Sequence, residues 1–291
     1  MTKTIIFTDS CCDLPISFVE ENNIQVMHLR VNIKGEDIPD DLGVSINNKD
    51  FYNLIRQGEM PTTSQVNVNT FEENFRKYIK EGYSIIYIGF SAALSGCVNS
   101  ARIAKENIEH EISDADITII DTKSASLGLG LIVYTAVNML KAGKEKSDIV
   151  NWIEDNKLKV NHWFTVDDLF HLKRGGRVSS TVAAVGTILS IKPIMHVDDE
   201  GRLIPASKTK GRKKSIKVLK EILVDKIVNP EEQTIFISHG DCIEDAEHLK
   251  ELILNEVKVK NVIINSVGPV IGSHTGPGIL ALFFMGSNRK L

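Results

Sequence analysis

Short apolar runs that lead into polar loops and then into helix-like runs recur along the chain, and this alternation restricts the fold more than any other feature. Thr4–Thr8, Ser84–Gly89 and Ile117–Asp121 are β-rich, and each is followed by a loop of small or polar residues and a helical pattern. Repeated strand–loop–helix units build a mostly parallel sheet covered by helices. The sequence therefore predicts an α/β fold for the first part of the chain.

The pattern changes at about residue 160. Further strands are predicted at His162–Val166, Ile191–Val197, Arg202–Ala206, Thr234–Ser238 and Asn261–Val267. Asp198–Gly201 reads as a tight turn that joins two of them as antiparallel partners. We therefore predict two α/β domains, residues 1–160 and 161–291, with a mostly parallel sheet in the first and a mixed or antiparallel sheet in the second. The last segment, 268–291, is a candidate to pack back on the first domain.

Several other elements are expected from local pattern. Ile24–Ile33 reads as one strand, and Gly35–Val44 is acidic and rich in turn residues. Helices are predicted at Ile16–Asn22, Asn48–Arg56, Asn69–Lys80, Val98–Asn107, Leu129–Ala142, Ser147–Asn156, Asp167–Lys173, Ser180–Leu189, Ser215–Ile227 and Ile243–Val257.

Composition limits the classes of function. The chain has 291 residues, 42% of them apolar, and a net charge of −4, which does not suit nucleic acid or an anionic membrane. No signal peptide is evident, and the apolar run Gly278–Met285 is too short to cross a bilayer. The four cysteines form no Cys-x-x-Cys pair, so we expect reduced thiols in a cytoplasmic protein.

Two loops rich in hydroxyl or small residues precede predicted helices. One is Pro61-Thr62-Thr63-Ser64-Gln65, and the other is Phe90–Cys97, which contains Ser95. Such hydroxyls usually cap the following helix, but with the free N–H groups of a helix start they also bind anions. Asp13 is expected to cap the first helix, whereas Asp9 either contacts these loops or orders its own turn. Both interpretations of the hydroxyl loops stay open at this point.

Two further segments carry basic side chains among glycines. Arg174-Gly175-Gly176-Arg177 is either a solvated turn or a close backbone approach that aims Arg177 at a carboxylate or phosphate. The segment 268–278 holds His274 at a predicted tight turn, from which the imidazole can hydrogen-bond an anion or act as an acid or base.

Other chemistries have weaker signals. There is no Walker A motif, dinucleotide fingerprint or Gly-x-Ser-x-Gly. An enzyme with Ser95 or Thr63 as nucleophile and His274 as base, a hydrolase or acyltransferase acting on a lipid, is the alternative. His239 and Asp241 lack a third metal ligand at a suitable spacing. The basic run Lys208–Lys214 is a solvated helix start, a nucleic-acid contact or a docking surface for an acidic partner.

Taken together, these segments resemble the DegV family of bacterial lipid-binding proteins. The matching segments, in the family's order, are Thr8-Asp9-Ser10, Asp13-Leu14-Pro15, Pro61–Gln65, Leu94-Ser95-Gly96, Asp121–Ser124, Asp168-Leu169, Leu172–Arg177, Ile191-Lys192-Pro193 and His274–Gly278. The resemblance implies a long-chain fatty acid of the palmitate or oleate class in an interdomain tunnel, with no metal and no other cofactor. It also implies a partner fatty acid kinase that supplies ATP and Mg²⁺ and phosphorylates the carboxylate, which this chain only presents.

The resemblance also implies the site residues. Thr63 and Ser95 match the family's carboxylate-binding threonine and serine. His274, Arg177, Ser64 and Thr275 are expected to form the supporting polar network. The sequence departs from the family at Cys11, Cys97 and Asn99, which leaves the preferred acyl chain open. Whether Lys208–Lys214 docks the kinase, or makes a transient membrane contact, also stays open.

Overall fold

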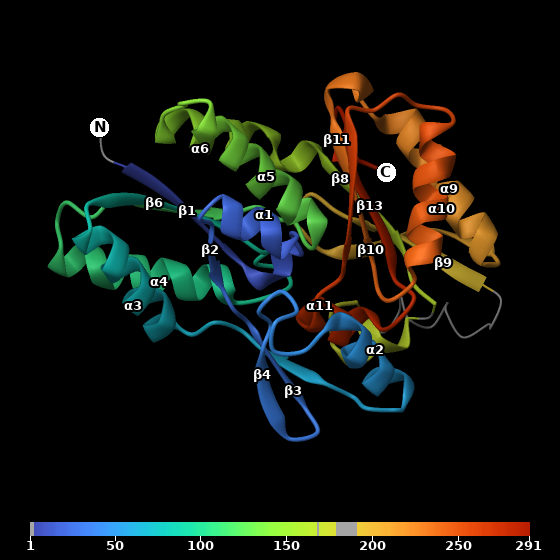
Figure 1. Ribbon diagram of the computed structural model, residues 1–291, viewed down its shortest axis with the longest axis horizontal. Coiled ribbons are helices and arrows are strands. Elements are labelled where there is room, and N and C mark those ends of the chain that lie inside the picture. The colour runs from blue at the N-terminus through green and yellow to red at the C-terminus, as the bar shows by residue number, and fades with distance from the viewer. Residues whose placement is uncertain (1–2, 168, 179–190) are drawn as a thin grey trace.

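Two β-sheets with helices packed around them form most of the molecule (Figure 1). The computed structural model describes residues 3–167, 169–178 and 191–291. The predicted helix Ser180–Leu189 lies outside the described residues.

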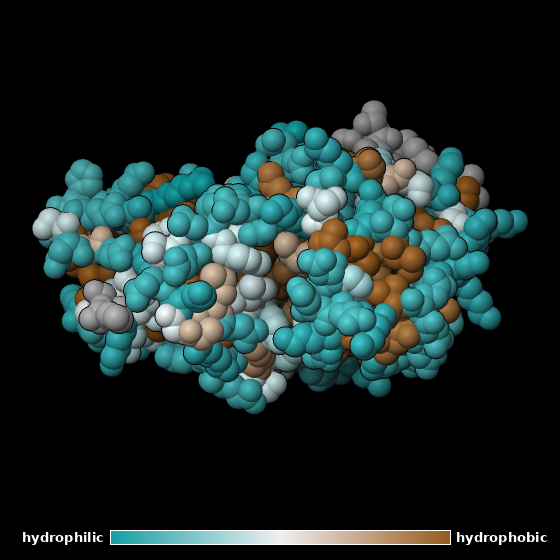
Figure 2. All heavy atoms as spheres, turned by 90° about the horizontal axis from the view of Figure 1, so that it is seen from above, coloured by the Kyte–Doolittle hydropathy of each residue, from teal (hydrophilic) through white to brown (hydrophobic). Residues whose placement is uncertain are grey.

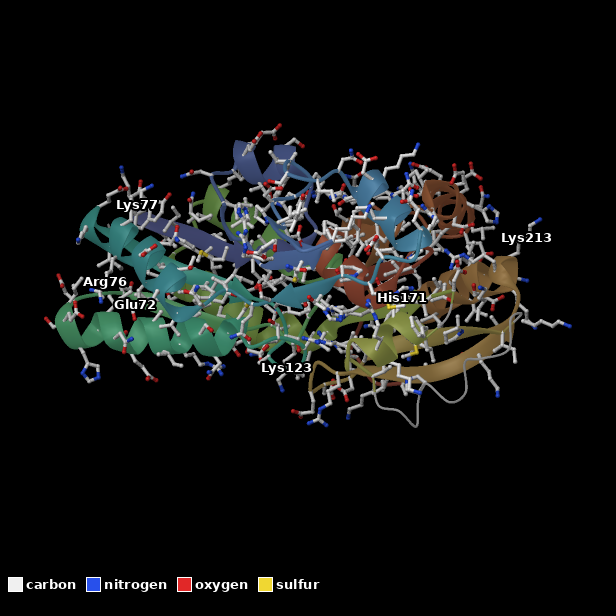
Figure 3. The ribbon with its side chains drawn as sticks, turned by 90° about the horizontal axis from the view of Figure 1, so that it is seen from below. Glu72, Arg76, Lys77, Lys123, His171 and Lys213 are labelled. Atoms are coloured by element: carbon white, nitrogen blue, oxygen red, sulfur yellow. The ribbon has the colours of Figure 1, made fainter. Side chains whose placement is uncertain are left out.

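The first sheet is parallel throughout and has the strand order β2-β1-β6-β7. Its strands are β2 (Gln25–Met27), β1 (Lys3–Asp9), β6 (Tyr83–Gly89) and β7 (Ile117–Asp121). Helices α3 (Val68–Lys80) and α4 (Cys97–Glu111) lie side by side against it, joined by the Arg76–Glu111 ion pair at 2.7 Å (Figure 3). Helix α5 (Leu127–Lys141) packs on β1 and β6. The prediction of a mostly parallel first sheet is confirmed.

The second sheet is mixed, as predicted, and has the order β10-β9-β8-β13-β11-β12. Its strands are β8 (Val160–Thr165), β9 (Ile191–Val197), β10 (Leu203–Lys210), β11 (Thr234–His239), β12 (Asn261–Ser266) and β13 (Leu280–Met285); only β11 and β12 pair in parallel. Helices α9 (Arg212–Lys226) and α10 (Ile243–Leu254) cover one face and bury alternate residues of β13, among them Leu282 (Figure 1). The other face turns toward α5 and the first sheet.

A small third sheet was not predicted. It consists of β4 (Glu36–Pro39), β3 (Arg30–Ile33) and β5 (Thr62–Ser64), all antiparallel. The prediction of a single strand over Ile24–Ile33 is wrong, because β2 and β3 belong to different sheets. The turn-rich segment 35–44 contains β4, which pairs with β3 across a Lys34–Gly35 turn where both residues have positive φ.

The segment that carries His274 is also different from the prediction. It forms the helix α11 (Pro269–Thr275) instead of a tight turn. Pro269 occupies the first helical position, which suits its fixed φ, and Gly276 ends the helix at φ 73°. Helix α11 contacts α2 (Asn48–Arg56), β3 and β5. The domain boundary at residue 160 stays a prediction.

The remaining elements are the helix α6 and several shorter helices. They are η1 (Ser10–Cys12), α1 (Ile16–Glu21), α6 (Lys146–Asn156), η2 (Lys157–Lys159), α7 (Phe170–Arg174) and η3 (Pro230–Glu232). Among the described residues, no helix is long and apolar enough to span a membrane. Hydrophilic side chains cover most of the face seen in Figure 2, with hydrophobic side chains grouped between them.

Candidate functional site

A cavity of about 370 Å³ lies between the loops that follow β6 and β7 and the face of the second sheet that α9 and α10 leave uncovered. This volume falls in the range of small-molecule binding sites. Most of its wall is apolar and is formed by Leu29, Phe90, Leu94, Ala125, Phe164, Leu172, Val197, Leu203, Val270, Ile271, Ile279, Ala281 and Phe283. An apolar chain is therefore the kind of ligand that this wall suits.

The six residues predicted for the site all line this one cavity. They are Thr63, Ser64, Ser95, Arg177, His274 and Thr275. They come from β5, from the loop before α4, from the segment after α7 and from α11, and these elements are far apart in the sequence. The fold thus brings together the residues that the sequence singled out, while their roles in binding stay predictions.

Thr63 and His274 form the polar pair of the site. Thr63 Oγ1 lies 2.8 Å from His274 Nε2. Pairing of β5 with β3 places Thr63 opposite Val31, so the hydroxyl stretch is a strand. The expectation that one of its hydroxyls caps the next helix is wrong, because Asn67 caps α3 by accepting a hydrogen bond from Thr70 N.

Burial lowers the pKa of His274 to about 4, and the nearby positive charges of Arg177 and Arg174 act in the same direction. The imidazole is therefore neutral at pH 7. Arg177 is the cation that lines the cavity, while His274 contributes a hydrogen bond. The positive charge of the site therefore comes from the arginine.

The Arg-Gly-Gly-Arg segment has a specific geometry. A Cβ on Gly175 would overlap the imidazole of His274, and Gly176 has φ +70°, so each glycine is needed for a different reason. Arg177 Nε donates to Leu94 O at 3.2 Å, which holds its guanidinium beside the Ser95 loop. Arg174 donates to Pro61 O and to Ser273 O, and it thereby connects β5 with α11.

Ser95 lies at the start of α4. Its Oγ accepts from Cys97 N at the long distance of 3.4 Å and donates to Cys97 Sγ at 3.4 Å. Because sulfur is a weak acceptor, a ligand carboxylate can replace it as the partner of this hydroxyl. The N-terminus of this 15-residue helix adds partial positive charge beside the cavity. Gln65, which we had not assigned to the site, also lines the cavity and donates to Ser100 Oγ.

The two remaining predicted residues differ in their surroundings. Thr275 is buried, and its hydroxyl donates to Ile271 O within α11. Ser64 is exposed at the surface end of the cavity lining. We therefore expect Ser64 to be the more adaptable of the two.

The two aspartates of the first loop have structural partners. Asp9 accepts hydrogen bonds from Cys11 N, Tyr87 Oη and Phe90 N, so it orders both its own turn and the loop after β6. The prediction that Asp13 caps α1 is wrong. Asp13 instead accepts from Gly268 N and from Ser126 Oγ, and it fixes the start of the helix that carries His274.

Asp13 predicts a pH dependence of stability. Burial raises its pKa to about 7 from 3.8, so between these values the folded chain holds a proton that the unfolded chain has released. The contribution of Asp13 to the free energy of unfolding should therefore fall as the pH rises from about 4 to about 7, whereas the lowered pKa of His274 acts in the opposite direction. Asp13→Asn should remove the Asp13 contribution and stabilise the protein at pH 8, with an upper bound of about 4 kcal/mol. Urea unfolding across this pH range measures the effect.

The exposed residue Asp114 supplies the matched control, because Asp114→Asn should leave the slope unchanged. The same dependence of the unfolding free energy on pH between 4 and 7 in the wild type and in Asp13→Asn would contradict the assignment.

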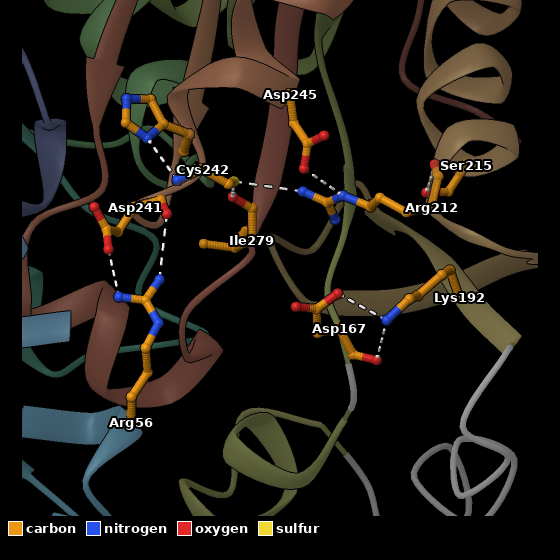
Figure 4. Close-up of polar contacts among 10 residues, drawn as sticks. Arg56, Asp167, Lys192, Arg212, Ser215, Asp241, Cys242, Asp245 and Ile279 are labelled. Atoms are coloured by element: carbon orange, nitrogen blue, oxygen red, sulfur yellow. Dashed lines mark hydrogen bonds and ion pairs between the residues drawn. The ribbon is translucent and has the colours of Figure 1, made fainter. Parts of the chain in front are cut away.

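His239 and Asp241 have partners that argue against a metal. Asp241 forms an ion pair with Arg56 of α2, and His239 Nδ1 accepts from Cys242 N (Figure 4). Within the described ranges, no group of three acidic, histidine or cysteine side chains is placed to hold a metal ion.

Comparison with known proteins agrees with this geometry. The model of the family described as "Uncharacterised protein, DegV family" matches residues 3–287. A DegV domain-containing protein of Clostridium perfringens is 52% identical over 290 residues, which are 100% of both chains. A DegV family protein from Thermus thermophilus, whose structure is described as showing fatty acid binding, has a TM-score of 0.89 at 28% identity, covering 98% of this chain and 99% of that one. DegV of Bacillus subtilis, described as a fatty acid binding protein, has a TM-score of 0.85 at 28% identity, covering 99% and 100%. The chain belongs to the DegV family.

Proposed function

We propose that this protein binds a long-chain fatty acid of the palmitate or oleate class, with the acyl chain in the apolar cavity and the carboxylate at Thr63 and Ser95. The main support is that one cavity has a mostly apolar wall and is also lined by the hydroxyls of Thr63 and Ser95, the imidazole of His274 and the guanidinium of Arg177. Relatives from Thermus thermophilus and Bacillus subtilis are described as fatty acid binding proteins, which supports it.

The hydrogen bonds favour a carboxylate at the polar end. His274 Nδ1 is buried and has no partner among the described residues, so the proton belongs on Nε2, which then donates to Thr63 Oγ1. The Thr63 hydroxyl is left free to donate to an anion. Ser95 Oγ and the Arg177 guanidinium supply the further donors that offset desolvation of the charge.

The same contacts give less support to a Ser/His hydrolase. His274 contacts Thr63, but with the proton on Nε2 the imidazole cannot take a proton from that hydroxyl. The other ring nitrogen has no acidic partner within the described residues. A nucleophile needs a base that is itself oriented by a third group. Binding and presentation of the ligand is therefore the better account.

Analysis of lipid extracted from purified protein tests the binding function. We expect mass spectrometry to find long-chain fatty acid at close to one molecule per chain, because each buried methylene contributes about 0.8 kcal/mol. Protein that carries no fatty acid and takes up neither added palmitate nor oleate would refute the proposal.

Thr63→Val tests the carboxylate contact. The substitution keeps the β-branched shape but removes the hydroxyl, and a hydrogen bond to a charged group is worth about 1.5–3 kcal/mol. We expect fatty acid to bind roughly 10- to 100-fold more weakly in a titration calorimeter. Thr62→Val, on the exposed neighbouring residue that does not line the cavity, should bind as the wild type does. Equal fatty acid affinities of the two variants would show that the Thr63 hydroxyl does not contact the carboxylate.

We further propose that the bound carboxylate is presented to a partner kinase that supplies ATP and Mg²⁺. We assign the contact with the kinase to the basic run Lys208–Lys214. Its four lysines are exposed, whereas Arg212 forms an ion pair with Asp245 (Figure 4). Strand β10 ends at Lys210 and α9 begins at Arg212, so these charges lie on one β–α corner, where Lys213 extends from the molecule (Figure 3). The four cysteines are free, which fits the reducing cytoplasm as the place of action.

Charge reversal tests the docking assignment. Lys213→Glu combined with Lys214→Glu should reduce acyl phosphate formation by the reconstituted kinase at least about tenfold, because like charges then face an acidic partner. Fatty acid affinity should be unchanged. Lys250→Glu on α10 is the control, and an equal loss for that variant would contradict a specific contact.

A further inference from the structure

Two buried carboxylates meet at the start of α11, the helix that carries His274. Asp13 Oδ1 accepts from Gly268 N at 2.9 Å, and Asp40 Oδ2 accepts from Val270 N at 3.1 Å. A Cβ on Gly268 would lie 3.0 Å from Asp13 Oδ1 and 3.2 Å from each carboxylate oxygen of Asp40. The two side chains therefore flank the same glycine, and together they hold the first turn of the helix.

The hydrogen bonds show which member of the pair lacks donors. Asp13 Oδ2 accepts from Ser126 Oγ, so both oxygens of Asp13 have a donor. Asp40 Oδ1 is buried and has no hydrogen-bond partner among the described residues. A buried carboxylate oxygen without a donor is costly when the group is charged, whereas the protonated acid has an O–H group of its own. Asp40 is therefore the member of the pair that the geometry favours as the proton carrier.

The surroundings of the pair supply no compensating positive charge. The other titratable groups that act on it are Asp9, Asp41, Tyr52, Cys11 and Cys12. All of these are neutral or negative, and His28, which lies near Asp41, has a pKa that burial lowers, so it is neutral at pH 7. Burial and then the charge of Asp13 raise the pKa of Asp40 well above its usual value. Two carboxylates in one buried site thus hold a proton to higher pH than either would alone.

Helix α11 connects this pair to the ligand cavity. The helix lies next to α2 (Figure 1), and its residues Val270, Ile271, His274 and Thr275 line the cavity. Val270, whose N–H group Asp40 accepts, precedes His274 by about one helical turn. A shift of the first turn would therefore move the imidazole that contacts Thr63.

We propose that Asp40 is a positioning residue through which pH controls fatty acid binding. While Asp13 and Asp40 share a proton, α11 stays in place, and ionisation of both carboxylates displaces the helix and weakens binding. This inference rests on the proposed function and names a regulation of the same cavity. Like charges in one buried site repel each other, and a ligand that needs α11 in place favours the protonated pair. The protonated form binds more tightly, so affinity should fall as the pH rises above neutral.

Calorimetric titration of the delipidated full-length protein with oleic acid at pH 6.5 and pH 8.5 tests this. We expect the wild type to bind at least about fivefold more weakly at pH 8.5. Asp40→Asn keeps an acceptor for Val270 N and carries no charge, so it should bind at pH 8.5 as it does at pH 6.5. Asp13→Asn removes the other charge and should flatten the profile as well. The ionisation of the probe is common to all variants and cancels in the comparison.

Glu36→Gln is the matched control, because Glu36 is an exposed acid at the other end of β4 from Asp40. It should keep the pH dependence of the wild type. Oleic acid affinity that is independent of pH in the wild type, or equally dependent on pH in the wild type and either aspartate variant, would overturn this inference and leave the proposed function intact. Absence of oleic acid binding at both pH values would overturn both.

Discussion

Replacing Ala281 by phenylalanine should abolish fatty acid binding while leaving the protein at least as stable as the wild type. Ala281 lies on β13 between Phe164 and Ser238 of the neighbouring strands, is 3% exposed and lines the cavity. A phenyl ring there would occupy space meant for the acyl chain. If about five methylenes of the acyl chain can no longer be buried in the cavity, binding weakens by roughly 4 kcal/mol, or about 1000-fold.

The stability of Ala281→Phe shows whether this residue faces a cavity or a close-packed core. Enlarging a side chain in a close-packed core destabilises by about 1–3 kcal/mol, but filling an existing cavity does not. Ala246→Phe is the contrasting control, since Ala246 is fully buried between α10 and the other face of the sheet. We expect that variant to unfold more easily in urea and to keep its fatty acid affinity. Destabilisation by Ala281→Phe of the same size would show that no cavity exists there.

Arg289→Met should destabilise the fold by about 3–5 kcal/mol. The Arg289 side chain is 1% exposed and donates to backbone carbonyls of Val160, Lys123, Lys157 and Asp198. It thereby connects the loop after β7, the start of β8 and the turn between β9 and β10. Burial lowers the pKa of Arg289 to about 10, so the guanidinium still keeps its proton at pH 7. Methionine fills a similar volume but leaves these carbonyls without a donor.

Chemical denaturation measures this effect, and the adjacent exposed residue supplies the control. Lys290→Met should change the free energy of unfolding by less than about 0.5 kcal/mol. A loss below about 1 kcal/mol for Arg289→Met would mean that water replaces the guanidinium, and that the C-terminal segment contributes little to holding the two sheets together.

The sequence predicted well the elements whose pattern is set locally. Strands β1, β6 and β7 are apolar runs bounded by polar loops, and the structure has them within one or two residues of the predicted limits. Strand β13 was missed because Leu280–Met285 is buried on both faces and shows no alternation, so that it read only as an apolar run too short to span a membrane. Its partner strands are far away in the sequence: Leu280 pairs with Thr165, 115 residues away, and Phe283 pairs with Phe236, 47 residues away. No local pattern reveals pairings at such separations.

Elements that depend on distant contacts were wrong or missing. The third sheet has strands of three or four residues, and β5 is a strand because Thr63 pairs with Val31. Thr63 and Ser64 therefore line a cavity, where local pattern suggested a helix cap. Likewise Asp13 binds Gly268, far along the chain, instead of the adjacent helix. In both cases tertiary pairing outweighed the local preference.

The polar part of the candidate site could be found from the sequence, whereas the apolar part could not. Segments with unusual glycine or hydroxyl content carry Thr63, Ser95, Arg177 and His274, and all four residues line the cavity. In the sequence, wall residues such as Phe164 and Ala281 cannot be told from core residues, because they differ only in facing a cavity instead of other side chains.

The central claim is that the cavity holds a fatty acid whose carboxylate is bound at one end by Thr63 and Ser95. The most direct measurement is a crystal structure of the purified protein with its bound lipid. We predict continuous density for an acyl chain along Phe164 and Ala281, with both carboxylate oxygens within hydrogen-bond distance of donors from Thr63, Ser95 or Arg177. A cavity filled by the protein's own side chains, or a chain bound with its carboxylate away from Thr63 and Ser95, would contradict the account.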